Sequence, residues 1–193
     1  MQEGCVLCPR KCGVDRNIQR GACNAPYFPY VAKAALHMWE EPCISGKRGS
    51  GAIFFCGCNL KCVFCQNYDI SNGSVGKMYD AEGIAELMLR LQGKGAHNVN
   101  LVSPAPFVPV LADAIRAAKN RGLSIPVVYN TNSYETLEAL RMLDGLVDIY
   151  LPDLKYVSGA ISKKYSGTEN YFEYAVRSAY RRSAIRTTST ARI

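Results

Sequence analysis

Short apolar runs alternate with amphipathic stretches four times across the middle of this chain. The apolar runs predict buried strands at 52–56, 99–102, 125–129 and 147–151. Helices are expected at 80–92, at 108–121, after residue 133, and more weakly at 160–180. Asp80 and Ser133 are the N-caps that we expect for the first and third of these. Strands joined by crossover helices predict a parallel sheet of the α/β class. Four βα units are too few to close an eight-fold barrel, so we expect an open, partial βα barrel.

The first 47 residues have a different composition, which is rich in cysteine and in turn-forming residues. Four of these cysteines follow the spacing C-x2-C-x3-C-x10-C: Cys5, Cys8, Cys12 and Cys23. Four thiolates suit either a zinc ion or an iron–sulfur cluster, and both alternatives stay open. We therefore predict a ligand-held N-terminal extension over 1–47, a core over 48–182, and a basic, disordered tail over 183–193.

The formal net charge is +7, but the excess is not spread over the chain. Five arginines and no acidic residue lie between Arg177 and Ile193, so the basicity belongs mainly to the C-terminal end. Nucleic acid is therefore not an expected partner. No apolar stretch approaches the roughly 18 residues of a membrane span, and residues 1–5 do not resemble a secretory signal. We expect a cytoplasmic protein with no membrane partner, in which clustered cysteines bind metal.

The segment "GCNLKCVFCQN" at 57–67 carries Cys58, Cys62 and Cys65 in the spacing C-x3-C-x2-C. A structural zinc takes four ligands, and a cubane cluster has four irons to ligate. Three cysteines leave one position open for a substrate or cofactor. The segment follows the strand at 52–56, at the end where parallel sheets place their chemistry. The alternative is a closed site with Cys56 as the fourth ligand, although a cysteine that ends a strand also packs as a small hydrophobe.

This cysteine pattern, with Phe64 directly before the last cysteine, resembles that of the radical SAM superfamily. Three longer strings are similar to relatives of pyruvate formate-lyase activating enzyme: "CVLCPRKCGVDR" (5–16), "HMWEEPCISGKRGSGAIFFCGCNLKCVFCQNYDIS" (37–71) and "GLVDIYLPDLKY" (145–156). The resemblance covers most of the chain, from residue 5 to about residue 175.

The resemblance implies a [4Fe-4S] cluster on Cys58, Cys62 and Cys65, with S-adenosylmethionine (SAM) on the fourth iron. An electron from the reduced cluster would cleave SAM to methionine and a 5′-deoxyadenosyl radical, which abstracts a hydrogen atom from the substrate. It also implies SAM-binding residues, one beside the last cysteine and the rest at strand ends: Phe64, Ser103, Asn130, Thr131, Asp153 and Lys155.

Some of these residues could instead have a purely structural role. Phe64 could pack in the core, and Asp153 with Lys155 could form a surface ion pair. Asn130 stands where such enzymes carry an aspartate, so a cation at that point is in doubt. His37, Glu40 and Glu41 could contact substrate or serve structure alone.

The resemblance implies a radical SAM enzyme that takes electrons from a donor and activates or modifies a partner protein. Radical SAM cores resemble six βα units, whereas this sequence indicates four, so we expect a truncated core. Two alternatives remain, namely a non-catalytic iron–sulfur or zinc protein and an inactive fragment.

Overall fold

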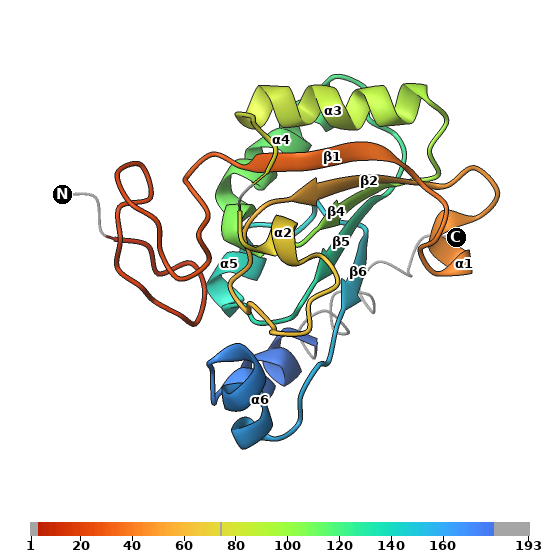
Figure 1. Ribbon diagram of the computed structural model, residues 1–193. Helices are drawn as coiled ribbons and strands as arrows, with labels where there is room; N and C mark the ends of the chain where they lie inside the picture. Colours follow the sequence, from red (N-terminus) through yellow and green to blue (C-terminus); the bar gives the residue numbers. More distant parts are fainter. Residues whose placement is uncertain (1–3, 74, 180–193) are drawn as a thin grey trace.

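The computed structural model describes residues 4–73 and 75–179 and shows one six-stranded sheet with helices packed against it (Figure 1). The strands are β1 (Tyr30–His37), β2 (Ser50–Phe55), β3 (Lys77–Met78), β4 (Val99–Val102), β5 (Val127–Thr131) and β6 (Ile149–Pro152). The helices are α1 (Pro42–Ser45), α2 (Tyr68–Ser71), α3 (Ala81–Gly93), α4 (Val108–Asn120), α5 (Leu137–Arg141) and α6 (Gly159–Ser166), with a 3₁₀ turn at Ala105–Phe107. Residues 171–179 are also helical.

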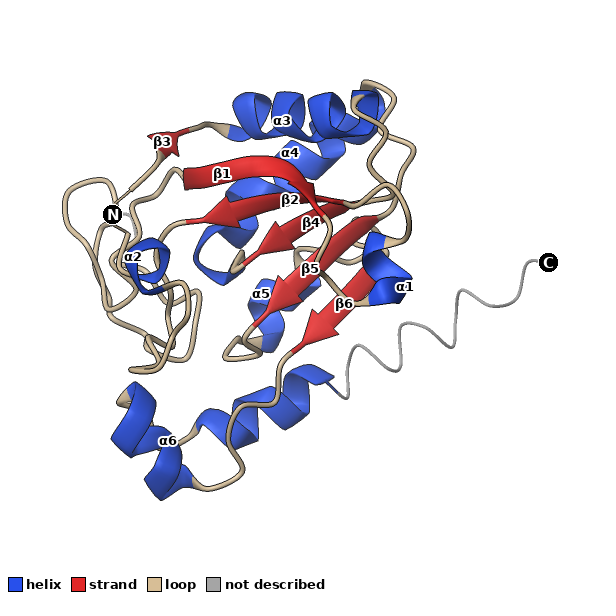
Figure 2. Ribbon diagram, turned by 45° about the vertical axis from the view of Figure 1, so that its right-hand side comes forward, coloured by secondary structure: helices blue, strands red, loops and turns tan. Residues whose placement is uncertain are grey.

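The strand order is β3-β1-β2-β4-β5-β6, and the four strands from β2 onward that the sequence predicts are parallel to one another. Their arrowheads point to the same end of the sheet (Figure 2). The sheet has six strands rather than four because β1 pairs antiparallel with β2, and β3 with β1. These two extra strands precede α3 in the chain and do not add βα units. The described part of the chain thus has an α/β fold with one open sheet, in which four of the strands are parallel.

Helices α3 and α4 pack together on one face of this sheet (Figure 2). Both helices have an apolar stripe that meets the buried side chains of the strands. The α3 helix begins as predicted, with the Asp80 side chain accepting a hydrogen bond from Gly83 N at 2.8 Å. The α4 helix ends next to Gly122, whose φ of 97° few other residues adopt readily.

Several local predictions are wrong in detail. The β2 strand spans Ser50–Phe55 rather than 52–56, and β6 spans Ile149–Pro152 rather than 147–151. The β5 strand starts at Val127 rather than 125, because Pro126 has no N–H for a ladder. Thr136, not Ser133, caps α5, and its hydroxyl accepts from Ala139 N at 3.2 Å. The helix expected at 160–180 is interrupted at Gly167, which adopts the left-handed conformation and ends α6.

The N-terminal loops, red in Figure 1, lie at the end of the sheet to which the parallel strands point. Residues 4–29 contain no helix or strand. Buried Arg16 fixes this segment by donating to Ala25 O at 3.3 Å and to the carbonyls of Pro26 and Pro106. The 1–47 segment also supplies β1 to the sheet, so it is joined to the core. The predicted 183–193 tail lies outside the described residues.

Across 4–73 and 75–179, none of the helices combines the length and the apolar character that a membrane crossing requires.

Candidate active site

The loop that carries the three clustered cysteines leaves β2 through Gly57. Gly57 has φ 92°, and a Cβ there would lie 2.9 Å from Cys23 O and 3.0 Å from Ala25 Cβ. A side chain at this position would therefore collide with the N-terminal segment. The next residue is also tied to that segment, since Cys58 N donates to Cys23 O at 3.1 Å. The loop thus starts at the C-terminal end of a parallel strand, in contact with the N-terminal loops.

Cys58, Cys62 and Cys65 all line one cavity of about 560 Å³. This volume lies within the range of ligand pockets, which is roughly 300–1,000 Å³. None of the three cysteines forms a disulfide, and Cys62 is buried. Desolvation raises the pKa of the Cys58 thiol, with smaller opposing hydrogen bonds from the backbone of Lys61 and Leu60. Burial thus disfavours the thiolate form of Cys58 unless a cation lies beside it.

The same cavity collects every residue that the sequence predicts for SAM binding. Its lining includes Phe64, Ser103, Asn130, Thr131, Asp153 and Lys155. Asn130 and Thr131 are the last residues of β5 rather than residues after it. The parallel strands thus bring these side chains together with the cysteines. Their binding roles stay predictions.

Phe64 does not pack as a core residue, because its side chain is 59% exposed. Its ring meets Tyr156 and Tyr165 edge-on, with centroids 6.2 Å apart in each pair. The core-packing alternative is therefore disfavoured, and the ring is accessible to a ligand in the cavity.

Asp153 and Lys155 form an ion pair, with Lys155 Nζ 2.6 Å from Asp153 Oδ2. Both side chains are partly exposed and both line the cavity. Buried Tyr171 holds this segment, because its hydroxyl accepts from Lys155 N at 3.0 Å and bonds to Asp153 O at 3.0 Å. Tyr171 thus holds the main chain of the pair, while the two charged side chains line the cavity.

His37, the last residue of β1, and Glu40 also line the cavity. Burial, and then the neighbouring Glu41, raise the pKa of Glu40, while His37 lowers it to a lesser extent. A carboxyl group that lines a cavity can accept a hydrogen bond from a bound molecule. Contact of either residue with a substrate stays a prediction.

Cys56 points elsewhere. Its thiol donates to Val75 O at 2.5 Å, and its side chain is buried at the end of β2. Cys56 does not line the cavity with the other three cysteines in the described part of the chain. This position favours the open three-cysteine site over a closed site with Cys56 as fourth ligand.

The N-terminal cysteines lie close to the cluster loop. Cys23 is buried, the other three are half-buried, and none is in a disulfide. Burial raises the pKa of Cys8 to about 11, despite a backbone hydrogen bond from Arg10 that lowers it. Within residues 4–73 and 75–179, no three or more His, Cys, Asp or Glu side chains gather as a site for one metal ion. A single zinc ion would require these thiols to move together, and the second site, zinc or cluster, stays a prediction.

A cubane differs from a single ion, because each cysteine ligates a separate iron and the thiols do not converge on one point. The donor set at the cavity fits this group: three free thiols on one loop, beside open space, at the C-terminal ends of parallel strands. Cys58, Cys62 and Cys65 would hold the cluster, and the remaining cavity leaves room for a second ligand.

Two residues that contact the cysteine sulfurs were not predicted. Asn132 Nδ2 lies 3.3 Å from Cys58 Sγ, and Ser166 Oγ lies 3.2 Å from Cys62 Sγ. Asn132 directly follows the predicted Asn130–Thr131 pair, so its position in "YNTN" is a signal that could have been used. Ser166 is 104 residues from its sulfur partner and gives no such signal.

Comparison with known proteins agrees with this geometry. A family model described as "Radical SAM superfamily" matches residues 52–190. The chain is 35% identical over 182 residues to "Uncharacterized protein MJ0674" of Methanocaldococcus jannaschii. The aligned region covers 91% of this chain and 52% of that protein. The chain therefore spans about half the length of this curated relative.

Proposed function

Since the chain belongs to the radical SAM superfamily, we propose that it reductively cleaves SAM at a [4Fe-4S] cluster held by Cys58, Cys62 and Cys65. One observation carries the proposal: these three thiols share a single cavity with the strand-end side chains that face them. When bound, the cluster supplies the electron that converts SAM to methionine and a 5′-deoxyadenosyl radical.

The residues of the chain bind and orient the cofactor pair. Asp153 and Lys155 would contact the charged methionyl end of SAM, because they present both signs of charge to the cavity. Phe64 would stack near the adenine, for which its exposed ring is available. Asn130 and Ser103 would supply neutral hydrogen-bonding groups from the adjacent strand ends.

The first test is cluster assembly and SAM binding. The chain is reconstituted anaerobically with iron and sulfide, reduced with dithionite, and examined by electron paramagnetic resonance (EPR) with and without SAM. The proposal expects a [4Fe-4S]⁺ signal whose shape changes on SAM addition, and loss of that signal in C62A. A signal that SAM does not change would contradict an open coordination position.

We further propose that the substrate is a partner protein, and that a separate one-electron donor reduces the cluster. The support is that two residues adjacent in sequence to residues of the cavity lining have large, exposed apolar side chains. Trp39, next to Glu40, is 88% exposed, and Leu154, next to Asp153, is 60% exposed. Tryptophan is enriched at protein interfaces, so the exposed Trp39 favours a macromolecular substrate over a small polar one.

Deuterium transfer tests the substrate class. Extract from cells grown in deuterated medium is divided by size, and each fraction is added to the reduced, SAM-loaded protein. A protein substrate predicts deuterated 5′-deoxyadenosine with the high-mass fraction only. Deuterium from the small-molecule fraction alone would contradict a protein substrate.

A zinc ion or second cluster at Cys5, Cys8, Cys12 and Cys23 and a cytoplasmic location also remain proposals. The metal proposal is supported by four free thiols in one short segment. Metal analysis of C8A tests it: the proposal expects the loss of one zinc or about four irons, with the SAM-responsive signal retained.

A further inference from the structure

Two of the three cysteine sulfurs in the loop accept hydrogen bonds from side chains elsewhere in the fold. Asn132 Nδ2 donates to Cys58 Sγ at 3.3 Å, and Ser166 Oγ donates to Cys62 Sγ at 3.2 Å. Asn132 follows β5, and Ser166 is the last residue of α6. The tertiary structure therefore places one donor against each of these two sulfurs.

The orientation of the Asn132 amide is fixed by its other partners. Tyr134 N donates to Asn132 Oδ1 at 2.9 Å, so the oxygen faces the main chain. Asn132 Nδ2 donates to Asn59 Oδ1 at 2.9 Å, and Asn59 Nδ2 donates in turn to Tyr134 O at 2.5 Å. The main chain of Tyr134 thus fixes the orientation of the side-chain amides of both Asn132 and Asn59. One N–H of Asn132 is used on Asn59, and the second is directed at Cys58 Sγ.

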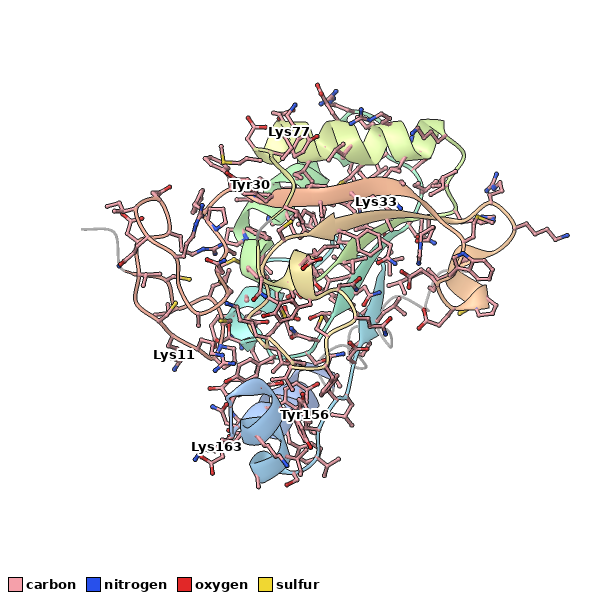
Figure 3. All side chains as sticks on the ribbon, viewed as in Figure 1. Lys11, Tyr30, Lys33, Lys77, Tyr156 and Lys163 are labelled. Atoms are coloured by element: carbon pink, nitrogen blue, oxygen red, sulfur yellow. The ribbon has the colours of Figure 1, made fainter. Side chains whose placement is uncertain are left out.

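The Ser166 hydroxyl is also oriented by a neighbour. Tyr156 OH lies 2.7 Å from Ser166 Oγ, and Tyr156 packs beside α6 (Figure 3). If each hydroxyl donates once, the phenol proton goes to Ser166 and the serine proton goes to Cys62 Sγ. Ser166, Tyr156 and Cys62 are all buried. Hydrogen bonds in such surroundings are electrostatically stronger than in water.

We infer that Asn132 and Ser166 are positioning residues that raise the reduction potential of the [4Fe-4S] cluster through the sulfurs of Cys58 and Cys62. The inference rests on the proposed function. Reduction by one electron makes the cluster and its ligand sulfurs more negative. Donors to those sulfurs therefore stabilise the reduced state more than the oxidised state. Tyr156 contributes by directing the Ser166 proton.

The test is an EPR-monitored redox titration of the full chain, reconstituted anaerobically, as wild type, S166A and N132A. Each variant is expected to lower the ratio of reduced to oxidised cluster about tenfold at a fixed potential, which corresponds to about 59 mV for one electron. S162A is the matched control, because this buried serine lies in the same helix and donates to Thr168 O at 2.6 Å, not to sulfur.

The outcomes separate the two proposals. Midpoints of S166A and N132A equal to wild type, with intact clusters, would overturn this inference and leave the proposed function standing. An equal shift in S162A would also overturn it, because the effect would then follow from general loosening of α6. A wild-type chain that assembles no cluster would overturn the proposed function itself. Either variant alone is sufficient if the other does not fold.

Discussion

The Arg10 guanidinium donates to the main-chain carbonyl of Asn59 at 2.9 Å, so the N-terminal segment is tied to the cysteine loop. The same group donates to Ser166 O at 2.6 Å and to Gly167 O at 2.7 Å. The five N–H donors of arginine, held in a planar fork, allow one side chain to join two segments that are distant in sequence. The N-terminal segment thereby holds the cysteine loop against the end of α6.

Replacing Arg10 should loosen this junction. R10A is expected to lower the free energy of unfolding by about 2–3 kcal/mol, since hydrogen bonds to a charged donor are lost and the carbonyls lose their partner. Urea unfolding followed by circular dichroism measures this. R10K keeps the charge but loses the fork, so it should recover only part of the loss. An unfolding midpoint of R10A equal to that of wild type would contradict the junction.

The ion pair of Asp153 and Lys155 should matter more for SAM than for stability. K155A is expected to weaken SAM binding to the cluster-loaded protein about tenfold, because a charge-assisted contact to the cofactor is lost. Its effect on unfolding should be below about 1 kcal/mol, since the pair is partly exposed. Calorimetric titration with SAM measures the affinity.

The control for K155A is K163A. Lys163 pairs with Glu169 at 3.0 Å on the exposed side of α6, away from the cavity lining. Equal SAM affinities of K155A and K163A would show that Asp153 and Lys155 form only a surface pair.

Tyr171 supports the strand-end segment that carries this pair. Y171F leaves the ring but removes a buried hydroxyl that contacts Asn132 O at 2.9 Å and Lys155 N at 3.0 Å. The expected loss is about 1–2 kcal/mol of unfolding free energy, because partly buried main-chain groups lose their partner. Y174F is the matched variant, since Tyr174 meets Tyr134 through its ring. Equal stabilities of Y171F and Y174F would contradict the support role.

The ionisation of Glu40 should make the stability of the folded protein depend on pH. Its pKa is raised in the folded state, chiefly by burial, so the folded protein binds this proton more tightly than the unfolded chain does. Ionisation of Glu40 therefore costs stability as pH rises above the ordinary glutamate pKa of about 4.3. E40Q should melt at a higher temperature than wild type at pH 7, and the gain should shrink toward pH 4. A gain that is the same at both pH values would contradict this origin.

The sequence predicts best where the signal is local. The apolar periodicity and Asp80 give α3, and the β4 strand matches its predicted residues. The β1 strand was missed because "YVAKAALH" combines alanine, lysine and histidine, and it forms through pairing with β2 rather than by propensity.

The candidate site shows the same difference between residues with a local sequence signal and residues with long-range contacts. Cys58, Cys62 and Cys65 and the strand ends could be identified from spacing and resemblance, and the parallel strands bring them to one cavity. Ser166 and Arg10 act through contacts that span more than 100 residues of sequence. Only the folded chain shows these contacts, because nothing in their immediate neighbours in the sequence indicates a partner.

The most direct test of the central claim is SAM cleavage by the reconstituted protein. The chain is loaded with iron and sulfide without oxygen, reduced with dithionite and supplied with SAM, and 5′-deoxyadenosine is quantified beside C62A. The account predicts 5′-deoxyadenosine from the wild type, and none above background from C62A, which has lost one cluster ligand. An assembled cluster that yields no 5′-deoxyadenosine would contradict it and favour a non-catalytic iron–sulfur protein.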